Sequence, residues 1–303
     1  MRIEKLNQTT KKNLLEDLLK RSPNSYEMYE EQVKAILDNV KKRGDEALFE
    51  YTEKFDGFCL DQQSVLVKEE EIEEAYTQVD RGLIEIIRKA LKNIETYHEK
   101  QRQYSWFDSK PDGTILGQKV TALDRVGVYV PGGKAAYPSS VLMNIVPAKT
   151  AGVREIIMVT PPGKDGKVTP TTLVAAKEAG ADKIYKVGGA QAIAALAYGT
   201  ESISKVDKIV GPGNIYVALA KKAVYGHVSI DSIAGPSEIL VLADETANPR
   251  YVAADLLSQA EHDEMASAIL VTVSMELAEK VSEQTELFIS QLSRGEIIRK
   301  SLD

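Results

Sequence analysis

The chain has 303 residues, a formal net charge of −7 and a pI of about 5.3. Binding to phosphate backbones requires a basic surface, so this charge argues against nucleic acid as the main partner. Hydrophobic residues make up 43% and charged residues 27% of the chain. These values are typical of soluble globular proteins, and the length suggests about two domains.

The sequence gives no sign of export or of membrane insertion. Its single cysteine, Cys59, excludes an internal disulfide and is typical of a reducing compartment. Residues 1–7 lack the apolar segment of a signal peptide. No apolar run approaches the roughly 18 residues that a membrane span needs. We therefore expect a cytoplasmic protein that does not contact a membrane.

The first hundred residues predict helices. Residues 9–20, 26–42 and 46–54 have helical compositions with short breaks between them. Between residues 69 and 103, apolar side chains recur at steps of three and four, which predicts a long helix that Gly82, near its middle, could kink or break. His98 lies on this apolar stripe, and we interpret it as a packed side chain because no chelating residue lies near it in sequence.

From residue 113 onward, short apolar strands alternate with helices. The strands are expected at 126–130, 155–160, 183–187, 208–210, 238–242 and 268–273. This alternation is typical of a parallel sheet covered by helices, because strands that are apolar on both faces are buried on both faces. The sequence therefore predicts an α/β fold.

Glycine-rich turns follow several of these strands, at Pro131-Gly132-Gly133, Gly188-Gly189 and Gly211-Pro212-Gly213. Such turns let backbone approach a ligand, and the helix N-termini behind them attract anions. None has the spacing of a known dinucleotide or P-loop motif, so they are either ordinary turns or a dinucleotide site. In the second interpretation, Tyr129, Gln191 and Asn214 lie beside the nucleotide.

A second candidate site lies on the helix expected at 248–262. Gln259 and His262 are three residues apart, so they share one face of that helix. They could be metal ligands or simply a polar helix end, and two ligands do not complete a zinc site, which needs three or four. A Ser-His-Asp triad with Ser237 is a further alternative, although no nucleophile-elbow pattern surrounds this serine.

Six segments carry a family resemblance. They are 125–133 (RVGVYVPGG), 137–148 (YPSSVLMNIVPA), 187–195 (VGGAQAIAA), 210–214 (VGPGN), 231–238 (DSIAGPSE) and 257–263 (LSQAEHD). In this order and spacing they resemble the histidinol dehydrogenase family, and six motifs together are far more specific than any one glycine turn. The N-terminal helices resemble the family more loosely, and Ser229 stands where the family pattern has Gly.

The resemblance implies a fold similar to that of aldehyde dehydrogenases, with two Rossmann-like domains, one inserted in the other. Residues 1–25 would form an N-terminal helical arm. Residues 26–125 together with 237–303 would form the first domain. Residues 126–236 would form the inserted second domain.

The resemblance also implies NAD-dependent oxidation of L-histidinol to L-histidine, the last steps of histidine biosynthesis. The reaction would proceed by two hydride transfers through a bound aldehyde, histidinaldehyde. Tyr129, Gln191 and Asn214 would contact NAD, which carries the hydride chemistry itself.

On the substrate side, the resemblance implies one zinc ion per subunit that orients L-histidinol. Gln259 and His262 would bind both zinc and substrate, and Ser237 would contact the substrate.

The family's catalytic Glu-His pair, two further zinc ligands and a small C-terminal domain of the homodimer would all follow Asp303. We therefore expect no catalytic residue in this chain, which would be an inactive fragment of a homodimeric dehydrogenase. The alternative is a non-catalytic nucleotide-binding or interaction module.

Overall fold

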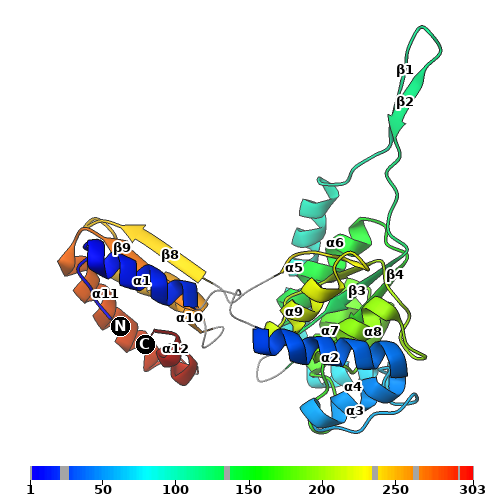
Figure 1. The fold of residues 1–303 in the computed structure, drawn as a ribbon, viewed down its shortest axis with the longest axis horizontal. Coiled ribbons are helices and arrows are strands. Elements are labelled where there is room, and N and C mark those ends of the chain that lie inside the picture. The colour runs from blue at the N-terminus through cyan, green and yellow to red at the C-terminus, as the bar shows by residue number, and fades with distance from the viewer. Residues whose placement is uncertain are drawn as a thin grey trace. The chain divides into compact units, whose positions relative to one another are not determined.

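The computed structural model describes residues 2–20, 27–132, 137–233, 238–261, 266–292 and 294–302. The chain forms two compact units, one of residues 27–234 and one of residues 1–26 with 235–303 (Figure 1). Within the described residues, no helix has both the length and the apolar character needed to cross a bilayer.

A five-stranded parallel sheet forms the centre of the larger unit. Its strands are β3 (Arg125–Tyr129), β4 (Glu155–Val159), β5 (Lys183–Tyr185), β6 (Lys208–Val210) and β7 (Ser229–Ile230). They are arranged in the order β5-β4-β3-β6-β7. This is the order 3-2-1-4-5 of the first five strands of a Rossmann fold, in which the direction of winding reverses between the first and fourth strands, here β3 and β6. The predicted α/β class with a parallel sheet is confirmed.

Helices cover both faces of this sheet. One group comprises α4 (Glu69–Gln78), α5 (Arg81–Glu99), α6 (Pro138–Thr150) and α7 (Pro170–Ala179), and the other α2 (Glu27–Arg43), α3 (Asp45–Asp56), α8 (Gly189–Tyr198) and α9 (Ile215–Val224). In the first group α6 packs against α5 and α7, and in the second α8 packs against α2, α3 and α9. The N-terminal helices α2–α5 therefore form the outer layers of the larger unit.

The long helix predicted for residues 69–103 is two helices, which corrects that expectation. The break lies at Val79 and Asp80, between α4 and α5. Asp80 begins the second helix because its carboxylate accepts a hydrogen bond from the backbone N–H of Leu83 at 3.1 Å. Gly82, two residues later, lies inside the first turn of α5 and is not the point of the break.

The central strand β3 contacts its two helical layers differently. Val126 and Val128 belong to the apolar core that also contains Ile145 of α6. Toward the other face, a Cβ added at Gly127 would lie 2.8 Å from Cδ1 of Leu196, so α8 approaches the strand closely. Every residue of α8 from Ala190 to Ala197 is buried, because small side chains allow this approach.

A β-hairpin and the smaller unit make up the rest of the described chain. Strands β1 (Trp106–Ser109) and β2 (Ile115–Gln118) form an antiparallel hairpin. In the smaller unit, β8 (Glu238–Ala243) and β9 (Ser267–Thr272) pair in parallel, and the helices are α1 (Gln8–Lys20), α10 (Pro249–Ala260), α11 (Met275–Ile289) and α12 (Gly295–Leu302). Apolar residues of α10 and α11 pack against these strands.

The domain division expected from the sequence stays a prediction. It joined residues 26–125 with 237–303, whereas in the structure helices α2–α5 pack with the sheet of residues 125–230.

The contact between α8 and β3 can be tested by substituting Leu196. Leu196 is fully buried, so replacing it with alanine should lower the free energy of unfolding by about 2 to 5 kcal/mol. Ile86 on α5 is 63% exposed, and Ile86→Ala should change it by less than about 0.5 kcal/mol. Urea unfolding followed by circular dichroism measures both variants. Equal effects would contradict the packing described here.

Candidate functional site

The carboxyl ends of three neighbouring strands converge on Pro161, the second residue after β4. A Cβ at Gly132, after β3, would lie 2.4 Å from Cγ of Pro161. A Cβ at Gly188, after β5, would lie 2.5 Å from Cβ of Pro161. Both positions therefore require glycine for close packing, in addition to any need of the turn itself.

The turn after β6 packs equally closely on the end of β3. Gly211 has φ of +111°, and a Cβ there would lie 2.1 Å from the carbonyl oxygen of Tyr129. Gly211 is thus fixed both by its backbone conformation and by its neighbour. The ends of β3 and β6 meet where the strand order reverses, which is where ligands bind in open parallel sheets.

An ion pair between a buried lysine and a partly exposed aspartate holds this turn in place. Lys221, only 2% exposed, donates a hydrogen bond to the Gly211 carbonyl oxygen at 2.9 Å and contacts the Asp231 carboxylate. The other oxygen of Asp231 accepts from the Gly211 N–H at 2.8 Å. Both polar backbone groups of Gly211 are therefore satisfied by a charged pair.

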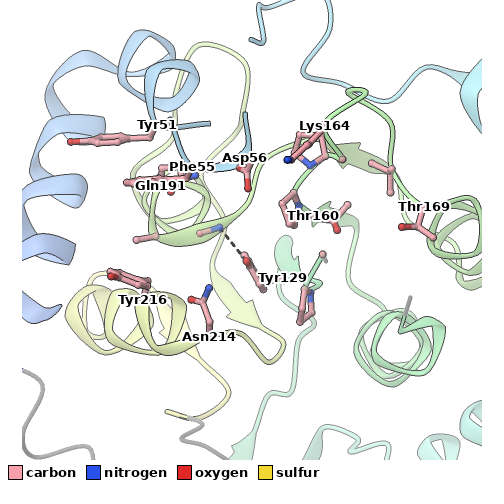
Figure 2. A pocket seen from close by; sticks show the side chains of 18 of the residues that line it. Tyr51, Phe55, Asp56, Tyr129, Thr160, Lys164, Thr169, Gln191, Asn214 and Tyr216 are labelled. Atoms are coloured by element: carbon pink, nitrogen blue, oxygen red, sulfur yellow. Dashed lines mark hydrogen bonds between the residues drawn. The ribbon is translucent and has the colours of Figure 1, made fainter. Parts of the chain in front are cut away.

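Asn214 begins helix α9 directly after this turn. Its side-chain oxygen accepts a hydrogen bond from the backbone N–H of Val217 at 3.2 Å, as an N-cap residue does. That bond fixes the orientation of the carboxamide, which lines a cavity at these strand ends (Figure 2).

Tyr129 and Gln191 supply buried polar groups at the same strand ends. The Tyr129 hydroxyl accepts a hydrogen bond from the Gly189 N–H at 3.1 Å (dashed in Figure 2). Burial raises the pKa of Tyr129 to about 12, so the phenol keeps its proton at neutral pH. Gln191 is 1% exposed, and neither its Oε1 nor its Nε2 has a hydrogen-bond partner among the described residues. An unpaired buried amide is costly in a folded protein, which indicates a polar ligand here.

These groups line a cavity of about 1380 Å³ within the larger unit. The structure thus brings together Tyr129, Gln191 and Asn214, the three residues that the sequence placed beside a nucleotide. It also adds lining residues that the sequence interpretation missed: Tyr51, Phe55, Asp56, Thr160, Lys164 and Tyr216 (Figure 2). The rings of Tyr51 and Phe55 on α3 are stacked with centroids 5.7 Å apart.

The predicted substrate and metal residues belong to the smaller unit. Gln259 lies in the last turn of α10 and is half-buried. Ser237 and His262 lie outside the described residues. Among the residues that are described, no group of three or more His, Cys, Asp and Glu side chains converges as a metal site would require. The described part of the chain therefore offers one of the four expected zinc ligands, Gln259, and does not by itself fit the ion.

The ion pair behind the Asn214 turn can be tested by substitution. Lys221→Met would leave the Gly211 carbonyl and the Asp231 carboxylate without their cation, and should lower the free energy of unfolding by about 2 to 4 kcal/mol. The neighbouring Lys222 pairs with Glu30 at 2.9 Å but is half-exposed. Lys222→Met should therefore cost less than about 1 kcal/mol. Thermal or urea unfolding measures both variants. Equal losses of stability would contradict the role of the Lys221–Asp231 pair in holding this turn.

Comparison with known proteins identifies the family. The histidinol dehydrogenase family model matches residues 19–303. The chain is 62% identical over 270 residues to histidinol dehydrogenase of Bacillus subtilis, covering 89% of this chain and 63% of that protein. It is 63% identical to the Clostridium acetobutylicum enzyme, covering 89% of this chain and 62% of the relative.

A solved structure agrees with this result. The crystal structure of histidinol dehydrogenase from Elizabethkingia anophelis matches with a TM-score of 0.82 at 37% identity, covering 99% of this chain and 64% of that one. The chain thus spans slightly less than two thirds of the length of these relatives. The resemblance found in the motifs is confirmed: the chain belongs to the histidinol dehydrogenase family.

Proposed function

We propose that the protein to which this chain belongs oxidises L-histidinol to L-histidine with NAD, by two hydride transfers through histidinaldehyde. Membership of the family supports the reaction. The observation that carries the cofactor assignment is the large cavity at the β3–β6 strand ends, with the unpartnered Gln191 carboxamide buried in its wall. Two NAD molecules, one for each oxidation, would supply the hydride acceptors, first for the carbinol and then for the aldehyde after a water has added to it.

The pocket has the features that a dinucleotide requires. At its base the strand ends pack closely, with Gly132 and Gly188 against Pro161, and Gly132, Pro161 and Gly189 line the cavity. Helices α8 and α9 begin at this edge, at Gly189 and Ile215, and their positive N-terminal ends favour the pyrophosphate.

Each of the three predicted NAD residues has a defined part in this proposal. Tyr129 keeps its hydroxyl proton and can donate it while accepting from Gly189. Gln191 offers one donor group and one acceptor that the protein leaves unpaired. Asn214 presents its amide from a helix N-cap whose geometry is fixed by Val217. Together they position the cofactor, and none of them transfers a proton in the reaction.

For the substrate side, we propose that Ser237, Gln259 and His262 contact L-histidinol, and that Gln259 and His262 provide two ligands to one zinc ion per subunit. Two ligands do not complete a zinc site. The remaining ligands and the acid–base residues would come from the third of the family's length that this chain does not span. A cytoplasmic homodimer is the assembly we propose.

The cofactor assignment predicts that Tyr129→Phe weakens NAD binding. Loss of one hydrogen bond from a buried hydroxyl is worth about 0.5 to 1.5 kcal/mol, so the affinity should fall by about 2- to 13-fold in calorimetric titration. Tyr185→Phe is the matched control, because its hydroxyl donates to the Ser202 carbonyl at 2.9 Å and does not line the cavity. An equal loss in both variants would count against a contact between Tyr129 and NAD.

This proposal places the NAD contacts in this chain and the acid–base residues in the remaining third of the family's length, which predicts how activity depends on chain length. The 303-residue chain should bind NAD without producing NADH from L-histidinol. A protein that also carries the remaining third of the family's length should turn over and should contain zinc. NADH absorbance and metal analysis of both proteins measure this. Turnover by the shorter chain at the rate of the longer one would refute the assignment of acid–base chemistry to the missing part.

A further inference from the structure

Asp56 occupies a position that is unfavourable for a carboxylate. It is the last residue of α3, followed by Gly57 in the left-handed conformation (φ +75°) as the helix C-cap. The C-terminal end of a helix carries partial negative charge, so an anion there is repelled. Asp56 is also half-buried, and burial raises the pKa of its carboxyl from 3.8 to about 6.

Among the described residues, no hydrogen bond or ion pair stabilises the Asp56 carboxylate. The Oδ2 atom of Asp56 is buried and has no hydrogen-bond partner among the described residues. No described cation forms an ion pair with it either, although Lys54 and Lys164 line the same cavity. A buried, unpaired acceptor at the wrong end of a helix indicates a group that is kept for a ligand.

Asp56 faces the same cavity as the predicted NAD residues. It lines the cavity with Tyr129 and Gln191, and its negative charge acts on the Tyr129 phenol. Figure 2 shows its carboxylate directed into the pocket from the end of α3. Gln191, with both polar atoms unpaired, lines the wall of the same cavity.

The loop after the second strand of the sheet is where an acidic residue usually recognises a ribose. In Rossmann folds that bind NAD, an Asp or Glu after the second strand accepts hydrogen bonds from the ribose hydroxyls. Here the second strand of the unit is β4, which is followed by Thr160, Pro161 and Pro162. The same loop continues to Asp165, which also lines the cavity, but Asp165 is exposed and its Oδ1 already accepts a hydrogen bond from the backbone N–H of Lys167 at 3.1 Å. Helix α3 brings to this cavity Asp56, whose Oδ2 is buried and has no partner among the described residues.

We propose that Asp56 accepts hydrogen bonds from the ribose hydroxyls of the bound dinucleotide and thereby selects NAD over NADP. This inference rests on the proposed use of a nicotinamide dinucleotide. Two vicinal hydroxyls are donors that match an unpaired carboxylate oxygen. A ribose 2′-phosphate would instead place like charges side by side in a partly buried site, which gives discrimination by repulsion.

The test is a titration of the 303-residue chain with NAD and with NADP, for the wild type, Asp56→Asn and Glu53→Gln. The wild type should prefer NAD, and Asp56→Asn should reduce the ratio of the two affinities by about tenfold through weaker NAD and tighter NADP binding. Glu53 is exposed on the preceding turn of α3 and does not line the cavity, so Glu53→Gln should keep the wild-type ratio while removing the same charge.

Thermal unfolding distinguishes a ligand contact from a structural role. The pKa of Asp56 is higher in the folded than in the unfolded chain, so its contribution to stability falls as the pH rises from 3.8 to about 6. Asp56→Asn should therefore raise the melting temperature at pH 7 and weaken this pH dependence. A melting temperature lowered by the substitution would overturn the proposal, because Asp56 would then support the fold.

The outcomes also separate this inference from the proposed function. An unchanged affinity ratio in Asp56→Asn, or a wild-type preference for NADP through Lys54 and Lys164, would overturn the role of Asp56 and leave the dehydrogenase assignment standing. If the wild-type chain bound neither dinucleotide, the cofactor assignment itself would fail, and this inference would fail with it.

Discussion

The candidate pocket depends on the close approach of strand ends that only glycine permits. Gly132 and Gly188 pack against Pro161, and Gly211 packs against the backbone of Tyr129. A methyl group at any of these positions would meet a neighbour at 2.1 to 2.5 Å, which neither backbone nor a proline ring can accommodate without moving. The strand ends therefore pack tightly together beside the point where the winding of the sheet reverses.

The same strand ends are fixed electrostatically from behind. Lys221 and Asp231 satisfy both polar groups of Gly211 while remaining buried or half-buried. Burying an ion pair seldom adds much net stability, because desolvation offsets the attraction. Its value here is geometric, since it holds the turn that leads into Asn214 in one conformation and so orients a binding group before the ligand arrives.

The sequence predicted the parts of this site that depend on local pattern. The alternation of apolar strands and helices gave the parallel sheet, and the residues after its glycine turns gave Tyr129, Gln191 and Asn214, all of which line one cavity. The contribution of α3 was missed because its packing against α8 is a long-range contact with no local signal. The sequence places the possible break at Gly82, two residues after Asp80, because apolar periodicity continues across it and the N-cap that causes it is a single side chain.

The residues that break ordinary folding rules gather around the cavity. Gln191 is the polar residue of the otherwise apolar stretch from Ala190 to Ala197 in α8. Asp56 places an acid at a helix C-terminus. Each has a buried polar atom with no partner among the described residues, and both side chains line the same cavity. An apolar residue at either position would destabilise the fold less, so both residues are what the proposed dinucleotide site requires at the expense of stability.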